Sequence, residues 1–219
     1  MQAGSDRLLA RLDRLTVALA ADVLDRLGLR AQVLSHGIRP VAGAERVAGV
    51  AFPIAAEPDE TILDNPYEHE LAAVDAVPPG AIVVLATRGY LDAAVWGELL
   101  TTRAVARGAA GAITDGAVRD LAALREVGFP TYAAAVSAND SRGRVAVRAW
   151  GGSVICAGVS IAAGDLVLAD ADGVVVVPWE IAEEMLAAAE EKRDKEELAR
   201  RLLAKGVSAA EVWERHRVL

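Results

Sequence analysis

The stretch GAITDGAVRD, residues 111–120, joins a run typical of a buried strand to a cluster of charges. The residues GAIT are small or apolar, which favours a short strand inside a sheet. Asp115-Gly116 is a dipeptide typical of turns, so we expect the strand to end there in a loop. Arg119 and Asp120 follow within that loop, and the sequence thus places two opposite charges side by side just after a buried strand.

The segments around this stretch alternate between strand and helix patterns. In chain order they are a turn and buried strand in PPGAIVVLA, a loop in RGYLDAAVW, a helix over residues 97–107, a helical turn in LAALREVG and a strand in PTYAAAV. Such alternation is typical of an α/β fold. Because the helix and the strand after it reverse the chain twice, the helix start and the strand end should share one sheet edge. Ligands of open α/β sheets bind at such edges.

The N-terminal part contains two predicted helices and a strand. Residues 5–28 carry leucine and valine at helical spacing, with Ser5 as a cap and Gly28 as a stop, and predict a helix. VAGVAFPIAA predicts a strand, in which Pro53 indicates a sheet edge or a bulge. Residues 66–76 predict a short helix with a proline in its first turn.

The C-terminal third differs in character. Short β-type runs between residues 144 and 178 are separated by glycine-containing turns and predict an antiparallel or mixed sheet. Residues 179–205 predict one long charged helix, followed by a short terminal helix. We expect a single domain over residues 1–219 with a helical arm from about 180 to 219. The arm is either a solvated helix or a surface that packs against a neighbouring subunit.

The composition favours a packed protein and argues against several partners. The 219 residues are 53% hydrophobic but only 4% aromatic, which indicates a core of small, close-packed side chains. A net charge of −8 without a basic stripe argues against nucleic-acid binding. The single cysteine and a charged N-terminus without an apolar signal core predict a cytoplasmic location. The sequence has no run of about 18 apolar residues, so we expect no membrane span.

Several common catalytic arrangements are missing from the sequence. No strand leads into a GxGxxG motif, and there is no Walker loop. The three histidines are far apart, and none adjoins a serine or cysteine in a known nucleophile motif. All three lysines lie in the C-terminal arm, a poor place for the desolvated amine of a Schiff-base enzyme. Cys156 lies in a β-type run and is predicted to be a buried core thiol.

Glu98 and the Arg119-Asp120 pair are the residues that could carry chemistry. The amides of residues 98–100 would be unpaired donors at a helix start, and Arg119 could hold the same anion. Asp120 and Glu98 supply the hard oxygen ligands that suit Mg²⁺. The alternative is structural: Arg119 and Asp120 simply begin a surface helix, and Asp115 and Asp120 serve as turn or capping residues.

The segment WGELLTTRAVARGAAGAITDGAVRD, residues 96–120, resembles the signature of the class II 4-hydroxy-4-methyl-2-oxoglutarate / 4-carboxy-4-hydroxy-2-oxoadipate aldolase family. That family is related to the proteins called regulator of ribonuclease activity A. Its metal motif is an acidic residue, twenty intervening positions and Arg-Asp, and here Glu98 and Arg119-Asp120 match it, with Glu replacing the more typical Asp. ADVLDRLG, GIRPVAGAERVAGVAF, VPPGAIVVLA and AGDLVLADADGVVVVP resemble further family segments in the same order, so the resemblance covers most of the chain.

The resemblance implies an α/β/β/α sandwich of the RraA-like type, assembled as a homotrimer or hexamer with its site at a subunit interface. It implies a metal-dependent lyase that cleaves a 4-hydroxy-2-oxo acid, such as 4-hydroxy-4-methyl-2-oxoglutarate, to pyruvate and a second 2-oxo acid. Asp120 would ligate a divalent cation, Mg²⁺ or Mn²⁺, directly and Glu98 through a water. Chelation of the keto oxygen would stabilise a pyruvate enolate, and the same chemistry would decarboxylate oxaloacetate. The residues implied to bind the 2-oxo acid are Arg119, Gly97, Glu98, Leu99 and Leu100.

The resemblance also implies roles for three further residues and one loop. Family members recruit an acidic residue from a neighbouring subunit, and Asp22 and Glu196 occupy the corresponding segments. His69 matches a family pocket histidine or has a purely structural role. The stretch VSANDSRGRVAV, residues 136–147, departs from the best-known aldolases at a substrate-facing loop, which leaves the exact substrate open.

Two other functions remain open at this point. The first is a non-catalytic regulator that binds a ribonuclease or another protein partner. Regulators of this type often lack the aspartate after the arginine, so Asp120 favours the lyase. The second is a related lyase or decarboxylase that uses the same site on a different 2-oxo acid.

Overall fold

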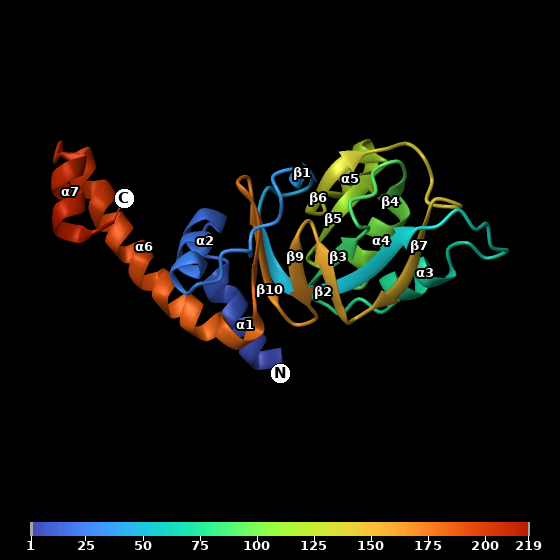
Figure 1. Ribbon diagram of the computed structural model, residues 1–219, viewed down its shortest axis with the longest axis horizontal. Helices are drawn as coiled ribbons and strands as arrows, with labels where there is room; N and C mark the ends of the chain where they lie inside the picture. Colours follow the sequence, from blue (N-terminus) through green and yellow to red (C-terminus); the bar gives the residue numbers. More distant parts are fainter. Residues whose placement is uncertain (1, 219) are drawn as a thin grey trace.

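The computed structural model describes residues 2–218 and shows a curled mixed sheet with helices on both sides (Figure 1). The strands of this sheet are β1 (Arg39–Ala42), β2 (Val47–Pro58), β3 (Ala81–Ala86), β4 (Ala94–Trp96), β5 (Gly111–Val118), β6 (Thr131–Val136), β7 (Val145–Trp150), β10 (Leu166–Asp170) and β11 (Gly173–Val177). Their main order is β1-β6-β5-β3-β2-β10-β11, with β4 paired to β5 and β7 paired to β2. A separate antiparallel hairpin consists of β8 (Ser153–Cys156) and β9 (Val159–Ala162).

The helices within residues 2–218 form two groups on opposite sides of the strands. They are α1 (Gln2–Leu12), α2 (Val17–Arg26), α3 (Glu68–Asp75), α4 (Glu98–Ala106), α5 (Leu121–Val127), α6 (Ala182–Ala204) and α7 (Ala209–His216), with a 3₁₀ turn at Trp179–Ile181. None of these helices is long and apolar enough to cross a membrane. Helices α3, α4 and α5 connect the parallel strands, whereas α1, α2 and α6 lie beyond β10 (Figure 1).

The parallel strands β2, β3, β5 and β6 form the centre of the sheet. Every residue of β3 and β5 is buried, as expected for parallel strands that are covered on both faces. Helices α3, α4 and α5 return the chain to the start of each next strand. The C-terminal ends of β3, β5 and β6 therefore lie at one edge of the sheet, which is the edge that the sequence predicts for a ligand.

Three hydrophobic clusters fill the spaces between the layers. One lies between the parallel strands and α3–α5, and includes Val74 and Leu124. A second joins the β8–β9 hairpin to the inner face of the curled sheet, and includes the fully buried Cys156. The third joins α1, α2 and α6 to the opposite face of β10 and β11, through residues such as Leu168 and Val175. The predicted α/β/β/α layering with a C-terminal helical arm is confirmed.

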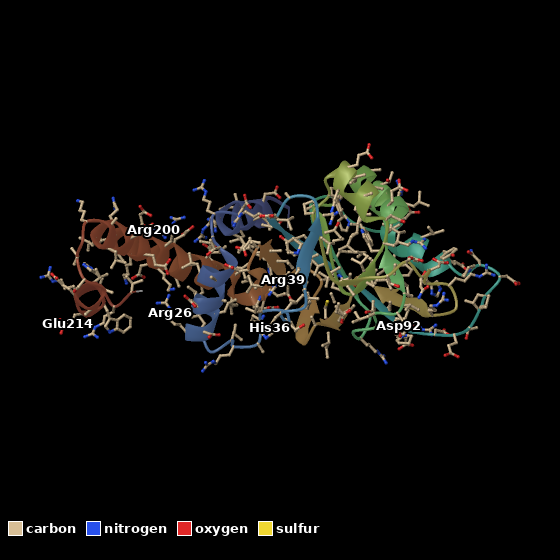
Figure 2. The ribbon with its side chains drawn as sticks, turned by 90° about the horizontal axis from the view of Figure 1, so that it is seen from above. Arg26, His36, Arg39, Asp92, Arg200 and Glu214 are labelled. Carbon is tan, nitrogen blue, oxygen red and sulfur yellow. The ribbon has the colours of Figure 1, made fainter. Side chains whose placement is uncertain are left out.

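The C-terminal arm extends away from the strands, with α7 at its far end (Figure 1). Its base is fixed to α1, because the Arg11 guanidinium makes two hydrogen bonds of 2.8 Å to the Glu190 carboxylate. At its tip, a small apolar cluster that includes Ala199 and Val212 holds α7 against α6. Figure 2 places Arg200 and Glu214 at the opposite end of the molecule from Asp92. Packing of this arm against a neighbouring subunit stays a prediction.

The single helix predicted over residues 5–28 is wrong, because the structure has two helices there. The chain breaks between Leu12 and Val17, and the side chain of Thr16 accepts a hydrogen bond from the amide of Leu19, which starts α2. Arg46 stabilises the break by donating to the carbonyl of Leu15. Leucines continue at helical spacing across the break, so the hydrophobic pattern hides it.

Of the two alternatives predicted for Pro53, a sheet edge or a bulge, the edge is wrong, since β2 lies in the middle of the sheet. A register shift does occur in β2 close by, between Ala55 and Ala56 in the pairing with β7. On one side β2 pairs with β3 along residues 50–55. On the other side it pairs first with β10 and then with β7, and Pro53 lies where one partner gives way to the other. The carbonyl of Pro53 accepts a hydrogen bond from the amide of Gly151. The nitrogen of Pro53, which has no proton to donate, faces the same side of β2, between the end of the β10 pairing and the start of the β7 pairing. A central strand thus accommodates a proline without losing a ladder bond.

The turn predicted at Asp115-Gly116 lies instead inside β5, which runs on to Val118. The carboxylate of Asp115 is only 6% exposed, and it accepts hydrogen bonds from the amides of Thr87, Gly89 and Ala157 and from the Thr87 hydroxyl, over 2.6–3.3 Å. The buried Asp115 carboxylate thus joins three segments, namely β5, the loop after β3 and the β8–β9 hairpin. Burial, and secondarily the Asp115 charge, raise the pKa of the Cys156 thiol far above its usual range.

We predict that Asp115→Asn lowers the free energy of unfolding by about 3 kcal/mol, because one amide NH₂ would face the N–H donors that the carboxylate now accepts. The measurement is equilibrium unfolding in urea. The exposed Asp64→Asn is the control, with an expected change below about 0.5 kcal/mol. Equal stabilities for the two variants would contradict a structural role for the buried carboxylate.

Candidate functional site

A short parallel pairing between β4 and β5 brings the two predicted halves of the site together. Ala94 lies opposite Ala117, and Trp96 lies opposite Val118. The amide of Arg119 then donates a 3.0 Å hydrogen bond to the carbonyl of Trp96. The chain segments that follow these two strands therefore leave the sheet side by side. Strand β4 is three residues long, too short for a periodic pattern, and the sequence predicts a loop in its place.

At Gly97 the two segments leave no room for a side chain. A Cβ atom at this position would lie 2.8 Å from Oδ2 of Asp120 and 3.1 Å from Cγ of Arg119. The φ angle of Gly97 is −164°, which any residue adopts, so the requirement for glycine is one of space. Gly97 also precedes α4 as its N-terminal cap residue.

Asp120 has an unusual backbone and an unusual partner. Its φ and ψ angles of 60° and 37° lie in the left-handed region, which few residues other than glycine adopt and which aspartate tolerates better than most. It stands at the N-terminus of α5, but its side chain makes no capping bond to that helix. Oδ2 accepts instead a 3.2 Å hydrogen bond from the amide of Glu98. The capping alternative is therefore wrong, and the Glu98 amide is not an unpaired donor.

The Arg119 guanidinium lies between two carboxylates. Its Nε is 3.6 Å from Oδ2 of Asp120, and its Nη1 is 3.2 Å from Oδ1 of Asp140. These are the closest approaches of the guanidinium to the two carboxylates. Asp140 also accepts a short hydrogen bond from the Tyr67 hydroxyl. Burial alone would raise the pKa of Asp140, but the Tyr67 hydroxyl and the Arg119 charge outweigh it and lower that pKa.

These residues line a cleft of about 570 Å³ at the C-terminal edge of the parallel strands. Its walls come from α3, from the starts of α4 and α5, and from the loop after β6. The polar residues from the first and last of these segments were not predicted from the sequence; they are Tyr67, Glu70, Asp140 and Ser141. Asp140 and Ser141 belong to the VSANDSRGRVAV stretch that departs from the best-known aldolases. Their position after a parallel strand was the signal that could have identified them.

Glu70 is the ionisable residue most strongly affected by its surroundings in the cleft. Burial raises its pKa to about 7, and the negative charge of Asp140 acts in the same direction. The positive charge of Arg119 and a hydrogen bond from Ser141 only partly oppose this shift. The carboxyl group of Glu70 is therefore partly protonated at neutral pH.

The start of α4 provides backbone donors at the cleft. The amides of Leu99 and Leu100 belong to the first turn, where a helix supplies no carbonyl acceptor. The Glu98 carboxylate lies along the helix, with Oε1 3.4 Å from the Thr102 hydroxyl. The Leu99 side chain is 76% exposed and forms part of the cleft wall.

The three remaining candidates lie outside this cleft. His69 is on α3, where Nδ1 is 3.1 Å from the carbonyl of Val147, and it lines a separate small cavity. Asp22 and Glu196 both form ion pairs with Lys192, at 2.5 Å and 2.8 Å, between α2 and the arm. Within one chain the structure does not bring them to Arg119. A role for them in the site of a neighbouring subunit stays a prediction.

Two comparisons with known proteins identify the family of this chain. Residues 17–176 match the RraA-like family, described as Aldolase/RraA. This chain belongs to the RraA-like family. The structure of Streptomyces coelicolor RraAS2, described as an unusual member of the RNase ES inhibitor RraA protein family, has a TM-score of 0.82 at 30% identity and covers 89% of this chain and 97% of its own. The α6–α7 arm lies beyond the matched residues.

The curated relatives of this RraA-like chain include proteins with an enzyme name. A protein of Halalkalibacterium halodurans, named "Putative 4-hydroxy-4-methyl-2-oxoglutarate aldolase", is 28% identical over 182 residues, which are 82% of each chain. Protein DlpA of Legionella pneumophila is 29% identical over 199 residues, or 91% of this chain. The chain spans only about a third of the length of DlpA, since the match covers 32% of that protein.

We predict that Glu70→Gln stabilises the protein at pH 8 by roughly 1–3 kcal/mol and has little effect at pH 4.5. The raised pKa of Glu70 means that the folded protein holds a proton that the unfolded chain releases between about pH 4.5 and 7. The free energy of unfolding therefore falls as pH rises through this window, and the glutamine variant removes that loss. The measurement is urea unfolding at both pH values, and a pH-independent difference would contradict the assignment.

Proposed function

We propose that this protein is a divalent-metal-dependent lyase that cleaves a 4-hydroxy-2-oxo acid, such as 4-hydroxy-4-methyl-2-oxoglutarate, to pyruvate and a second carbonyl product. The same site would decarboxylate oxaloacetate. The supporting observation is the meeting of Arg119, Asp120 and the N-terminus of α4 at one cleft. The name of the Halalkalibacterium halodurans relative supports the same class of reaction.

The substrate's carboxylate would bind between Arg119 and the start of α4. The guanidinium of Arg119 and the first-turn amides of Leu99 and Leu100 are donors at the same cleft. A guanidinium beside a helix N-terminus favours an anion through both charge and hydrogen bonds. Asp140, itself held by the Tyr67 hydroxyl, fixes the guanidinium in place through Nη1.

The donor set at the cleft fits a cation that keeps most of its water. No group of three or more His, Cys, Asp or Glu side chains that could enclose a metal occurs among residues 2–218. Mg²⁺ needs only one or two carboxylates when substrate oxygens and waters complete its shell. Asp120, whose side chain is 46% exposed, would be the direct ligand, and Glu98 would act through a water. The bound cation would stabilise the negative charge that develops on the 2-oxo acid as the carbon–carbon bond breaks.

We predict that the protein releases pyruvate from 4-hydroxy-4-methyl-2-oxoglutarate and from oxaloacetate with Mg²⁺ or Mn²⁺, and that EDTA abolishes the release. Asp120→Asn should lower the metal-dependent rate at least 100-fold, because an amide is a far weaker metal ligand than a carboxylate. Asparagine also tolerates the left-handed backbone at this position, so the fold should persist. The measurement is coupled detection of pyruvate, with circular dichroism to check the fold.

The exposed Asp64→Asn serves again as the control and should retain the wild-type rate. A lack of pyruvate from both substrates with added metal would count against the lyase. Wild-type turnover by Asp120→Asn would refute the metal assignment alone.

We further predict that Gly97→Ala lowers kcat at least tenfold while the protein stays folded. The added methyl group would displace the Asp120 carboxylate and the Arg119 side chain, since both lie too close to the position of a Cβ atom. Gly37→Ala is the matched control, because nothing lies within 4 Å of a Cβ atom at that position. Equal kcat values for the two alanine variants would show that the contact at Gly97 is unimportant for turnover.

A second candidate function is a non-catalytic regulator that binds a ribonuclease. The likeness to RraAS2 over 97% of that chain favours it. The two functions differ in what they require of Asp120. Inhibition of an RNase ES-type enzyme that persists in Asp120→Asn, without pyruvate release by the wild type, would favour the regulator over the lyase.

A further inference from the structure

The proposed cleavage needs a group in the cleft that carries a proton. When the bond between C3 and C4 of a 4-hydroxy-2-oxo acid breaks, its electron pair remains on C3. The C4 hydroxyl loses its proton as C4 becomes a carbonyl carbon, and C3 then gains a proton to complete pyruvate. Both the hydroxyl oxygen and C3 are bonded to C4, so one carboxyl group beside them can serve both. Atoms and charge balance without any oxidant or reductant.

Tyr67 and Asp140 line the cleft but are engaged with each other and with Arg119. The Tyr67 hydroxyl donates its proton to Oδ2 of Asp140, and Oδ1 of Asp140 lies 3.2 Å from Nη1 of Arg119. The hydrogen bond to Asp140 and burial raise the pKa of Tyr67, so the phenol keeps its proton. Because both oxygens of Asp140 already have partners, this pair is suited to holding Arg119 rather than to taking a proton from a substrate.

The carboxylates of Asp120 and Glu98 have a different role in the proposed function. Oδ2 of Asp120 accepts a hydrogen bond from the amide of Glu98, and the Glu98 carboxylate lies along α4 near the Thr102 hydroxyl. Both are the proposed ligands of the divalent cation, which would offset their negative charge. His69 contacts the carbonyl of Val147 and lines a separate cavity, so it does not compete for this role.

Glu70 is the remaining carboxyl group among the described residues that line the cleft. It lies on α3 three positions after Tyr67, and therefore on the same side of the helix. The Ser141 hydroxyl is its hydrogen-bond partner, which leaves lone pairs of the carboxylate for a substrate hydroxyl. Burial raises the pKa of Glu70 to about 7, and a group with such a pKa both accepts and donates a proton efficiently near neutral pH.

The charges near Glu70 act on it in opposite directions. Asp140, in the loop after β6, favours the protonated form, whereas Arg119, after β5, favours the charged form. Glu70 borders both the cleft and the small cavity beside it. The other titratable side chains that line these two spaces are Tyr67, Glu68, His69, Glu98, Asp120 and Arg148.

We infer that Glu70 is the catalytic proton carrier of the cleft, whose carboxylate takes the proton of the C4 hydroxyl and returns it to C3. This inference rests on the proposed function. Tyr67 and Asp140 are then positioning residues for Arg119. The decarboxylation of oxaloacetate differs in one respect, because the departing carboxylate has no proton to remove. The two reactions of the same site therefore differ in whether breaking the bond requires Glu70.

The variant Glu70→Gln tests this difference with Mg²⁺ at pH 8. It should lower kcat for the cleavage of 4-hydroxy-4-methyl-2-oxoglutarate at least about 100-fold, because an amide does not accept the hydroxyl proton. The release of CO₂ from oxaloacetate should stay within about threefold of the wild-type rate, because it needs no base. Circular dichroism checks the fold.

Glu68→Gln is the matched control, since Glu68 lies on the same helix but does not line the cleft. This variant should keep both rates. Cleavage at the wild-type rate by folded Glu70→Gln would overturn the inference. An equal loss of cleavage and decarboxylation would also overturn it, because Glu70 would then act on binding or on the shape of the site rather than on the proton.

The pH dependence of the wild type tests the same assignment and decides it if Glu70→Gln does not fold. The kcat/KM for cleavage should fall about tenfold for each pH unit below about 7, since a protonated Glu70 cannot take a proton. The release of CO₂ from oxaloacetate should not show this decline. The same acid limb in both reactions would assign the limb to a shared group and overturn the role of Glu70.

The two substrates also separate failure of this inference from failure of the proposed function. A wild type that releases pyruvate from neither substrate with Mg²⁺ or Mn²⁺ would refute the lyase and, with it, the role of Glu70. Pyruvate from both substrates, with a Glu70→Gln variant that affects them equally, would keep the lyase and refute the role of Glu70 alone. Selective loss of cleavage in Glu70→Gln would support both.

Discussion

The parallel pairing of β4 with β5 is the interaction on which the candidate site depends. A single backbone hydrogen bond, from the amide of Arg119 to the carbonyl of Trp96, fixes where both strands end. From that point the chain enters α4 on one side and α5 on the other. The Asp120 carboxylate can then accept a hydrogen bond from the amide of Glu98, because Gly97 has no side chain that would keep the two segments apart. The site is thus built from backbone geometry first and from side chains second.

The buried Asp115 supports this arrangement from within the same strand. Its carboxylate accepts donors from the segment after β3 and from the β8–β9 hairpin, and so ties both to β5. Two aspartates five positions apart therefore have different roles. Asp115 is buried and fully hydrogen-bonded, whereas Asp120 is half exposed at the cleft. Both residues are aspartates, so the residue type does not tell their roles apart. Their different burial does.

Local patterns predicted the order of the main elements because each depends on neighbours in sequence. The strand at residues 81–86, the helix after Gly97 and the long α6 follow from hydrophobic runs, glycine and helix propensity. The two wrong predictions in the N-terminal part have a different cause, namely contacts between residues far apart in the sequence. The break before Val17 depends on Arg46, and the place of Pro53 in a central strand depends on two separate partners. Such long-range contacts produce no periodic hydrophobic pattern from which they could be predicted.

The sequence patterns by themselves determined the α/β class and the spacing of Glu98 from Arg119 and Asp120, since both are properties of the chain, and the α/β/β/α layering followed only from the resemblance to a family. Only the tertiary structure decided what surrounds that motif. Tyr67, Glu70 and Asp140 come from α3 and the loop after β6, and they reach Arg119 because parallel crossovers bring the strand ends together. The net charge of the cleft depends on residues from all of these distant segments, so no local sequence pattern could have predicted it.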